Sequence, residues 1–131
     1  MLELFKERKY INLATYRKNG SLVPTPVWFV QDQKGLYVRT IANSGKVKRV
    51  RNNPQVQVAV CDARGNLLGD WLPARAQLVD EETAEKVNRW LRKKYGLQKL
   101  FFDLLGKLRR NESETLLIEF ERGKESKEVE I

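Results

Sequence analysis

The stretch YVRTIANSGKVKRVR, residues 37–51, predicts a β-strand that leads directly into a short helix. Residues 36–40 are rich in the β-branched and aromatic side chains that strands favour. Ser44 is a preferred N-cap residue, and Pro54 ends the helix because proline cannot continue a helical hydrogen-bond ladder. We therefore expect a strand over 36–40, a tight connection, and a helix over 44–53.

The start of this helix has the composition of a phosphate site. The first backbone N–H groups of a helix lack partners within the helix, and the helix dipole adds partial positive charge at the same end. The cationic and hydroxyl side chains that accompany them are Arg39, Thr40, Ser44 and Lys46. Because groups of this kind bind phosphate, we expect these residues to converge on an anion. The alternative is a basic helix whose charges are simply solvated.

The overall charge favours an anionic partner. The chain has 131 residues, which corresponds to one domain, and a formal net charge of +8 with a pI near 9.7. Such an excess attracts phosphorylated cofactors, polycarboxylates, nucleic acids or acidic membrane surfaces. No apolar run reaches transmembrane length, so we expect no transmembrane segment.

Two residue counts exclude further kinds of site. The chain has no His, which excludes Ser-His triads, His-ligated metal and an imidazole acid or base. With one Cys, Cys61, no intramolecular disulfide can form, which fits a reducing cytosol. The N-terminal residues 1–9 are too charged for a signal peptide. We therefore expect a cytoplasmic protein without a metal centre.

The rest of the chain predicts an antiparallel β-domain with helices. Alternating apolar residues and turn signals, such as KNGS at 18–21, indicate six strands. The strands are expected over 10–17, 22–31, 36–40, 55–60, 70–79 and 115–120, and further helices over 1–9, 81–95 and 97–110. Six short strands in meander order predict a closed or split β-barrel, because closure removes exposed strand edges. The expected fold is therefore mainly β (α+β), a single domain over 1–131 with a core at about 10–120 and a loose tail over 121–131.

Two prolines distinguish the strand expected over 22–31. Pro24 and Pro26 cannot donate ladder hydrogen bonds. A strand that contains them must lie at an edge of the sheet or be open on one side at these positions.

Six short motifs follow one another along the chain. They are PTPVWF at 24–29, LYVRT at 36–40, SGKVKR at 44–49, NPQV at 53–56, CDARG at 61–65 and KKYGL at 93–97. The first four, in this order and spacing, resemble the flavin-binding split-barrel superfamily, which includes pyridoxamine phosphate oxidases. The last two are similar to a branch of deazaflavin-dependent oxidoreductases from actinobacteria and their relatives. The resemblance covers about residues 10–120.

The resemblance implies a homodimer with two cofactors at the subunit interface. The residues that it implies around each cofactor are Pro26, Val27, Trp28, Val38, Arg39, Thr40, Ser44, Gly45, Lys46, Arg49 and Trp71. By the resemblance, Gly45 would allow the backbone to approach closely, and the cofactor phosphate would be held by Arg39, Thr40, Ser44 and Lys46. The backbone of residues 26–28 lies against the isoalloxazine-type ring, where the prolines leave room for a ring edge. Trp71 of the partner subunit is expected near the same ring.

The cofactor expected from the resemblance is the deazaflavin coenzyme, of the 8-hydroxy-5-deazaflavin type, with FMN as the alternative. Both carry a phosphate on a ribityl chain, so the phosphate motif does not separate them. The deazaflavin coenzyme adds a polyglutamate tail that suits the basic excess. The chain is too short for the additional C-terminal substrate segment of true pyridoxamine phosphate oxidases, so we do not expect that activity. It also lacks the His that haem-handling split barrels commonly use.

We therefore expect an oxidoreductase in which the bound deazaflavin or flavin transfers hydride to an electron-poor small molecule. No side chain is identified as catalytic, since water or a Tyr suffices as proton donor. One alternative is a non-catalytic carrier that binds the same cofactors. The other is a basic nucleic-acid-binding domain. Its basic residues are not interleaved with aromatic residues as a stacking platform requires, so nucleic acid is not the expected partner.

Overall fold

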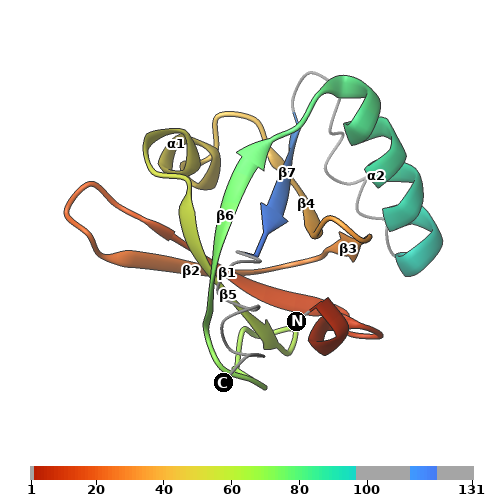
Figure 1. The fold of residues 1–131 in the computed structure, drawn as a ribbon, viewed down its shortest axis with the longest axis horizontal. Coiled ribbons are helices and arrows are strands. Elements are labelled where there is room, and N and C mark those ends of the chain that lie inside the picture. Colours follow the sequence, from red (N-terminus) through yellow and green to blue (C-terminus); the bar gives the residue numbers. More distant parts are fainter. Residues whose placement is uncertain (1, 97–112, 121–131) are drawn as a thin grey trace, which may run out of the picture.

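Seven antiparallel strands form one curled sheet in the computed structural model, which describes residues 2–96 and 113–120 (Figure 1). The strands are β1 (Tyr10–Tyr16), β2 (Leu22–Val27), β3 (Val30–Gln31), β4 (Leu36–Ile41), β5 (Gln55–Cys61), β6 (Leu72–Leu78) and β7 (Ser113–Glu119). The helices of the described part are the 3₁₀ helix η1 (Leu2–Phe5), α1 (Gly45–Asn52) and α2 (Glu81–Tyr95). The helix expected over 97–110 and the tail over 121–131 lie outside the described residues.

The strand order is β2-β1-β5-β6-β7-β4-β3. The predicted meander holds for the pairs β1–β2, β3–β4, β5–β6 and β6–β7, and it is wrong between β4 and β5, which pair with β7 and β1 instead. The strand expected over 22–31 divides at Trp28 and Phe29 into β2, which pairs with β1, and β3, which pairs with β4. This division raises the strand number from the expected six to seven. One continuous segment thus begins at one edge of the sheet and ends at the other, and its bend joins the two edges covalently. The split-barrel class and its antiparallel pairing are confirmed.

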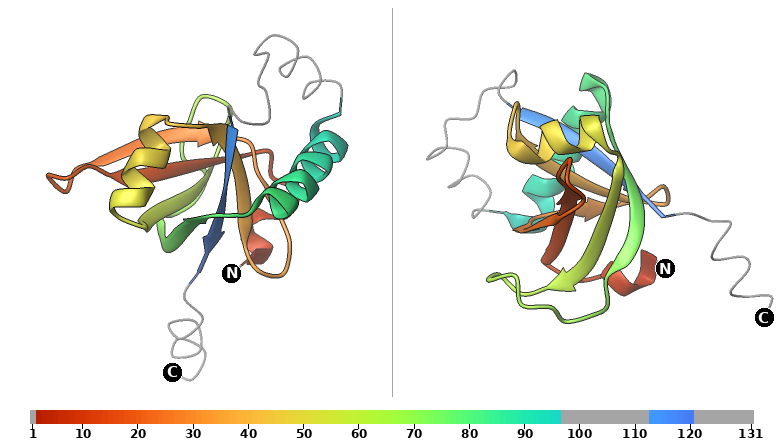
Figure 2. Two further views of the ribbon diagram at one scale, coloured as in Figure 1. Left: turned by 90° about the horizontal axis from the view of Figure 1, so that it is seen from above. Right: turned by 90° about the vertical axis from the view of Figure 1, so that its left-hand side faces the viewer.

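Inward-facing apolar residues fill the barrel, and a short helix covers each of its ends (Figure 2). Val38, Val58 and Leu116 are completely buried there, as strand alternation requires. At one end α1 inserts Val50 into this core. At the other end η1 inserts Phe5, whose ring stacks at 5.5 Å on that of Phe120. Burying a side chain of this size contributes about 1.5–3 kcal/mol, so even the four-residue η1 is held firmly.

The α2 helix lies outside the barrel, against β3, β4 and β7 (Figures 1 and 2). Its expected span is confirmed, and it begins at Asp80, whose side chain accepts a hydrogen bond of 2.8 Å from the Thr83 N–H. Val87, Leu91 and Tyr95 form its buried stripe and pack on outward-facing residues of the sheet. The outer face of β4 is therefore apolar where α2 covers it.

The last turn of α2 also holds the bend between β2 and β3. The Phe29 N–H donates to the Tyr95 hydroxyl at 3.0 Å. That hydroxyl lies 2.7 Å from the Lys9 carbonyl oxygen and 3.0 Å from that of Phe29, and these two acceptors share its single proton. Trp28 stacks on the Tyr95 ring, with centroids 4.4 Å apart. Burial raises the pKa of Tyr95, so the hydroxyl keeps its proton and remains a donor.

Replacing Tyr95→Phe should lower the free energy of unfolding by about 1–3 kcal/mol. The change leaves the buried Phe29 N–H without its partner, and an unsatisfied buried donor costs about that much. Urea denaturation measures the loss. The matched control is Tyr16→Phe, whose hydroxyl accepts one longer bond, 3.2 Å from Gln57 Nε2. Equal losses in the two variants would show that Tyr95 has no special role at the bend.

Candidate functional site

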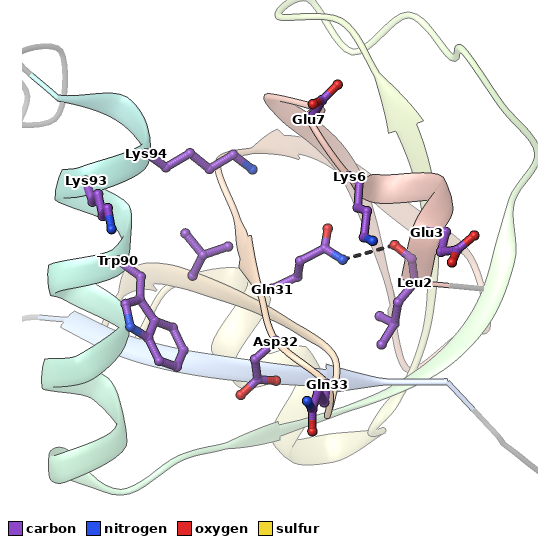
Figure 3. Close-up of a pocket in the computed structure, with 11 residues that line it drawn as sticks. Leu2, Glu3, Lys6, Glu7, Gln31, Asp32, Gln33, Trp90, Lys93 and Lys94 are labelled. Atoms are coloured by element: carbon purple, nitrogen blue, oxygen red, sulfur yellow. Dashed lines mark hydrogen bonds between the residues drawn. The ribbon is translucent and has the colours of Figure 1, made fainter.

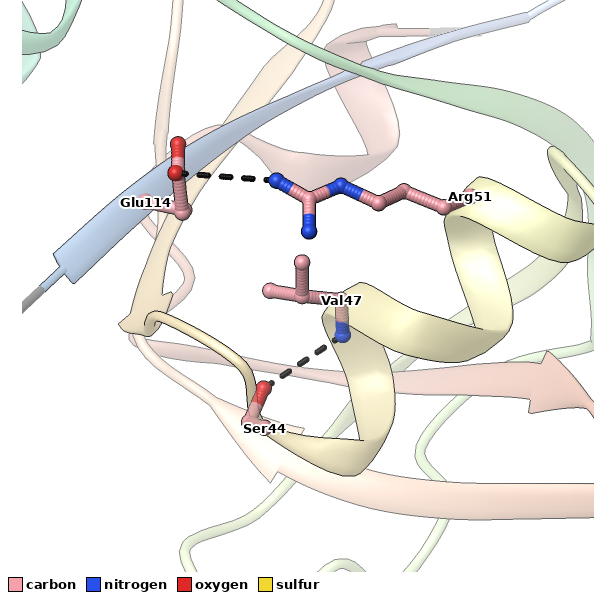
Figure 4. Close-up of polar contacts among 4 residues, drawn as sticks. All are labelled: Ser44, Val47, Arg51 and Glu114. Carbon is pink, nitrogen blue, oxygen red and sulfur yellow. Dashed lines mark hydrogen bonds and ion pairs between the residues drawn. The ribbon is translucent and has the colours of Figure 1, made fainter.

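The connection from β4 to α1 presents the N-terminus of a helix. Ser44 has extended backbone and caps α1, with its Oγ accepting from the Val47 N–H at 3.4 Å (Figure 4). Asn43 precedes it with a φ of 61°, in the left-handed region that Asn tolerates. The Ser44 cap and the helix that follows it are therefore confirmed. Because the cap bond is long, the Ser44 hydroxyl is only weakly committed to its own helix.

Arg49 folds back over this first turn. Its Nε donates to Thr15 Oγ1 at 2.6 Å, and Thr15 is completely buried in β1. A Cβ atom at position 45 would come within 2.7 Å of Arg49 Nη1, so Gly45 leaves the space in which the guanidinium lies. The bond to Thr15 holds this cation at the N-terminal end of α1. The group that approaches Gly45 closely is therefore the Arg49 guanidinium of the same chain.

Lys46 is partly buried beside this guanidinium. Burial and the charge of Arg49 lower the pKa of Lys46, because both disfavour a second cation there. Within residues 2–96 and 113–120, neither Lys46 nor Arg49 has an ion pair. The nearby carboxylate of Glu114 lies 3.8 Å from Arg51 instead (Figure 4). Two cations and a helix N-terminus therefore share one corner without an acidic partner from the described chain, which is the electrostatic pattern of an anion site.

The β4 residues of the expected site divide between two faces. Thr40 is 8% exposed, and its Oγ1 lies 3.4 Å from Ser44 Oγ, at the start of α1. Neighbouring strand residues point to opposite faces, so Arg39 lies on the outer face with Tyr37. The structure thus brings Thr40, Ser44 and the basic residues of α1 into one region. The phosphate contact of Arg39 stays a prediction.

Two open strand edges diverge from the bend at Trp28 and Phe29. Within residues 2–96 and 113–120, β2 pairs with β1 alone, and Pro24 and Pro26 deprive its other edge of two N–H donors. β3 covers only the first two residues of β4, so no described strand pairs with β4 on that side from Val38 onward. The Val38 side chain is completely buried in the barrel, which leaves its backbone for any ligand. The three expected segments, 26–28, 38–40 and 44–49, therefore border the same opening of the barrel.

Comparison with known protein families identifies the family of this chain. A family model described as pyridoxamine 5'-phosphate oxidase matches residues 1–125. The chain belongs to the pyridoxamine 5'-phosphate oxidase family. The predicted split-barrel superfamily is thereby confirmed. No curated protein sequence matches the chain.

Solved structures share the fold of this family member at low sequence identity. The heme storage protein HutZ from Vibrio cholerae is 23% identical, with a TM-score of 0.69, over 91% of this chain and 86% of HutZ. A structure titled F420 Reductase is 20% identical, with a TM-score of 0.58, over 90% of each chain. A NimC/NimA family protein from Clostridium acetobutylicum is 16% identical, with a TM-score of 0.61, over 91% of this chain and 82% of its own. At these identities the likeness is one of fold.

The sequence did not identify three residues of this chain that shape the site. Thr15 was visible as a polar residue on the inward face of β1, which is the signal that a buried partner exists. Asn12 donates to the Gly65 carbonyl at 3.1 Å beside Pro26 and holds the 62–66 loop against β2. Tyr95 lies at the end of the apolar stripe of α2, and nothing in its spacing reveals the bend that it holds. Trp71, which was expected near the ring, is partly exposed just before β6.

Among the described residues, no helix is both long and apolar enough to span a membrane.

Proposed function

We propose that this member of the family is an oxidoreductase that binds a flavin-type cofactor at the opening of the barrel. The observation that carries the proposal is the pair Lys46 and Arg49, two cations at the α1 N-terminus without an acidic partner among the described residues. Burial and the charge of Arg49 lower the pKa of Lys46, and a phosphate there would offset both by giving the ammonium a charged partner. It would also accept from the free N–H groups of the first helical turn. The donor set therefore fits a cofactor phosphate.

The edges of β2 and β4 fit the remainder of such a cofactor. On the open edge of β2, the carbonyl oxygens beside Pro24 and Pro26 have no neighbouring N–H from the prolines. These oxygens can accept hydrogen bonds from N–H groups of the cofactor ring. Trp28, which the Tyr95 ring holds by stacking, borders the same segment. When bound, the flavin or deazaflavin ring supplies the hydride chemistry, and the chain positions it. The chain has no His, so an accompanying proton has to come from another side chain or from water.

A non-catalytic carrier is the second candidate. It is favoured by the fold shared with the heme storage protein HutZ, and by the absence of an identified catalytic residue. For haem itself this chain offers no imidazole ligand, because it has no His. Turnover of the reduced cofactor with a panel of quinones and enones separates an oxidoreductase from a carrier. Tight cofactor binding without turnover of any substrate would favour the carrier.

We expect the deazaflavin coenzyme to bind more tightly than FMN. The net charge of +8 favours its polyglutamate tail, and the fold shared with the structure titled F420 Reductase supports the same choice. Fluorescence titration of the purified protein with each cofactor measures the two dissociation constants. Equal or tighter binding of FMN would contradict the preference and leave the phosphate site intact.

Replacing Lys46→Ala should weaken cofactor binding by roughly 10- to 100-fold. A charge-assisted hydrogen bond contributes about 1.5–3 kcal/mol, and each 1.4 kcal/mol is about tenfold in affinity. The melting temperature without cofactor should not fall, because burial and Arg49 already disfavour the Lys46 charge. Lys48→Ala removes the same charge from an exposed position on α1 and serves as the control. Equal losses in both variants would indicate a diffuse basic surface in place of a phosphate contact.

We expect a homodimer with the cofactor at the subunit interface. β2 is an open edge strand, and apolar side chains such as Leu67 and Leu68 are 45% and 57% exposed. Light scattering at micromolar concentration should give twice the chain mass of 15.3 kDa. A monomer that still binds the cofactor tightly would show that the site is complete within one chain.

A further inference from the structure

A second concave region lies between η1, β3 with its following turn, and the last turns of α2 (Figure 3). It forms a pocket of about 700 Å³, within the usual range for small-molecule sites. None of the residues proposed for the cofactor lines it. The cofactor proposal therefore leaves this pocket without a role.

Part of the pocket lining is apolar and aromatic. Val30 lines the pocket and is 5% exposed. Leu2 of η1 lies across the pocket from Trp90 (Figure 3). The Trp90 indole is 38% exposed and faces the pocket from α2. Its ring packs edge-on against Tyr37, with centroids 5.8 Å apart, which fixes its orientation. Because the indole is partly exposed and its orientation is fixed, a flat aromatic ring can bury apolar surface against it and form a stacked or edge-to-face ring pair.

The Lys94 ammonium lies at the same pocket. Nζ donates to the Phe29 carbonyl oxygen at 2.9 Å and lies 3.6 Å above the centre of the Phe29 ring. An ammonium has three donors, and within the described residues the structure gives this one a single hydrogen-bond acceptor and no ion pair. Burial lowers the pKa of Lys94 to about 8. An anion bound here would gain a hydrogen bond from a cation that lacks a charged partner.

The charges around the pocket limit what that anion can be. The lining lysines Lys6, Lys93 and Lys94 are matched in number by the lining acids Glu3, Glu7 and Asp32. Asp32 already accepts from the Tyr37 hydroxyl at 2.9 Å and from two backbone N–H groups. A phosphate monoester carries about −1.5 to −2 charges, and a lining with as many acids as lysines offers no net positive charge to balance them. A single carboxylate needs only Lys94.

We propose that this pocket is a ligand site for small aromatic monocarboxylates, with the ring against Trp90 and the carboxylate on Lys94. The site is independent of the proposed cofactor site, because it uses other elements and other residues. It gives the chain a second specificity, for a flat, singly charged organic acid.

Calorimetric titration with three probes tests the proposal on the full-length chain. 1-Naphthoate should bind, whereas 1-naphthamide has the same ring without the charge and should bind at least about tenfold more weakly. 1-Naphthyl phosphate should bind no more tightly than the carboxylate. Raising the pH from 7 to 9.5 should weaken naphthoate binding, because Lys94 then loses its proton while lysines with ordinary pKa values keep theirs. The other titratable groups at the pocket are Glu3, Lys6, Glu7, Asp32, Lys93 and Tyr95.

Matched variants assign the effect to these residues. Lys94→Met should weaken naphthoate at least about tenfold, and Lys94→Arg should restore binding, which excludes a folding defect as the cause. Lys86→Met removes the same charge from an exposed position on α2 outside the pocket and should change nothing. Trp90→Leu should weaken all three probes. Equal binding of naphthoate and naphthamide, equal losses in the two lysine-to-methionine variants, or no naphthoate binding at millimolar concentration would each overturn the proposal. Lys46→Ala should leave naphthoate binding intact, so this result is separate from the fate of the cofactor site.

Discussion

The Tyr95 hydroxyl holds the backbone at the point where β2 becomes β3. At that bend the chain leaves one edge of the sheet for the other, so the Phe29 N–H and carbonyl have no strand partner. Buried backbone groups need hydrogen bonds, and the last turn of α2 supplies them through Tyr95 and Lys94. The position of α2, the divergence of the two open edges and the orientation of Trp28 all follow from this contact.

The opening that diverges from the bend ends at the α1 helix. There the chain places two cations in a partly buried corner, while the Glu114 carboxylate pairs with Arg51. An arrangement of this kind weakens the free protein slightly, since like charges repel. It becomes favourable when an anion binds, which is the common physical basis of phosphate sites. The bond from Arg49 to Thr15 matters because it orders a cation before the ligand arrives.

The two sites use different residues and differ in electrostatics. At α1 the cations have no acidic partner among the described residues, which suits a phosphate and an extended anionic cofactor. At the pocket of Trp90 and Lys94, equal numbers of acids and lysines leave one partly buried ammonium as the anchor. Membership of the pyridoxamine 5'-phosphate oxidase family explains the barrel and its opening, whereas the pocket depends on residues of η1 and α2. The last turns of α2 contribute Tyr95 to the bend and Lys94 to the pocket. A shift of these turns would therefore change the bend and the pocket together.

Local sequence patterns predict individual helices and strands of this protein. Ser44 identifies the start of α1, because capping is a contact within a few residues. The alternation of Val56, Val58 and Val60 predicts a strand with one buried face for the same reason. Which strands pair depends on the packed fold, since pairing of β4 with β7 joins residues more than seventy positions apart and no local pattern encodes it. The contact by which Thr15 orders Arg49 depends on packing in the same way, because it joins a strand and a helix that are distant in the sequence.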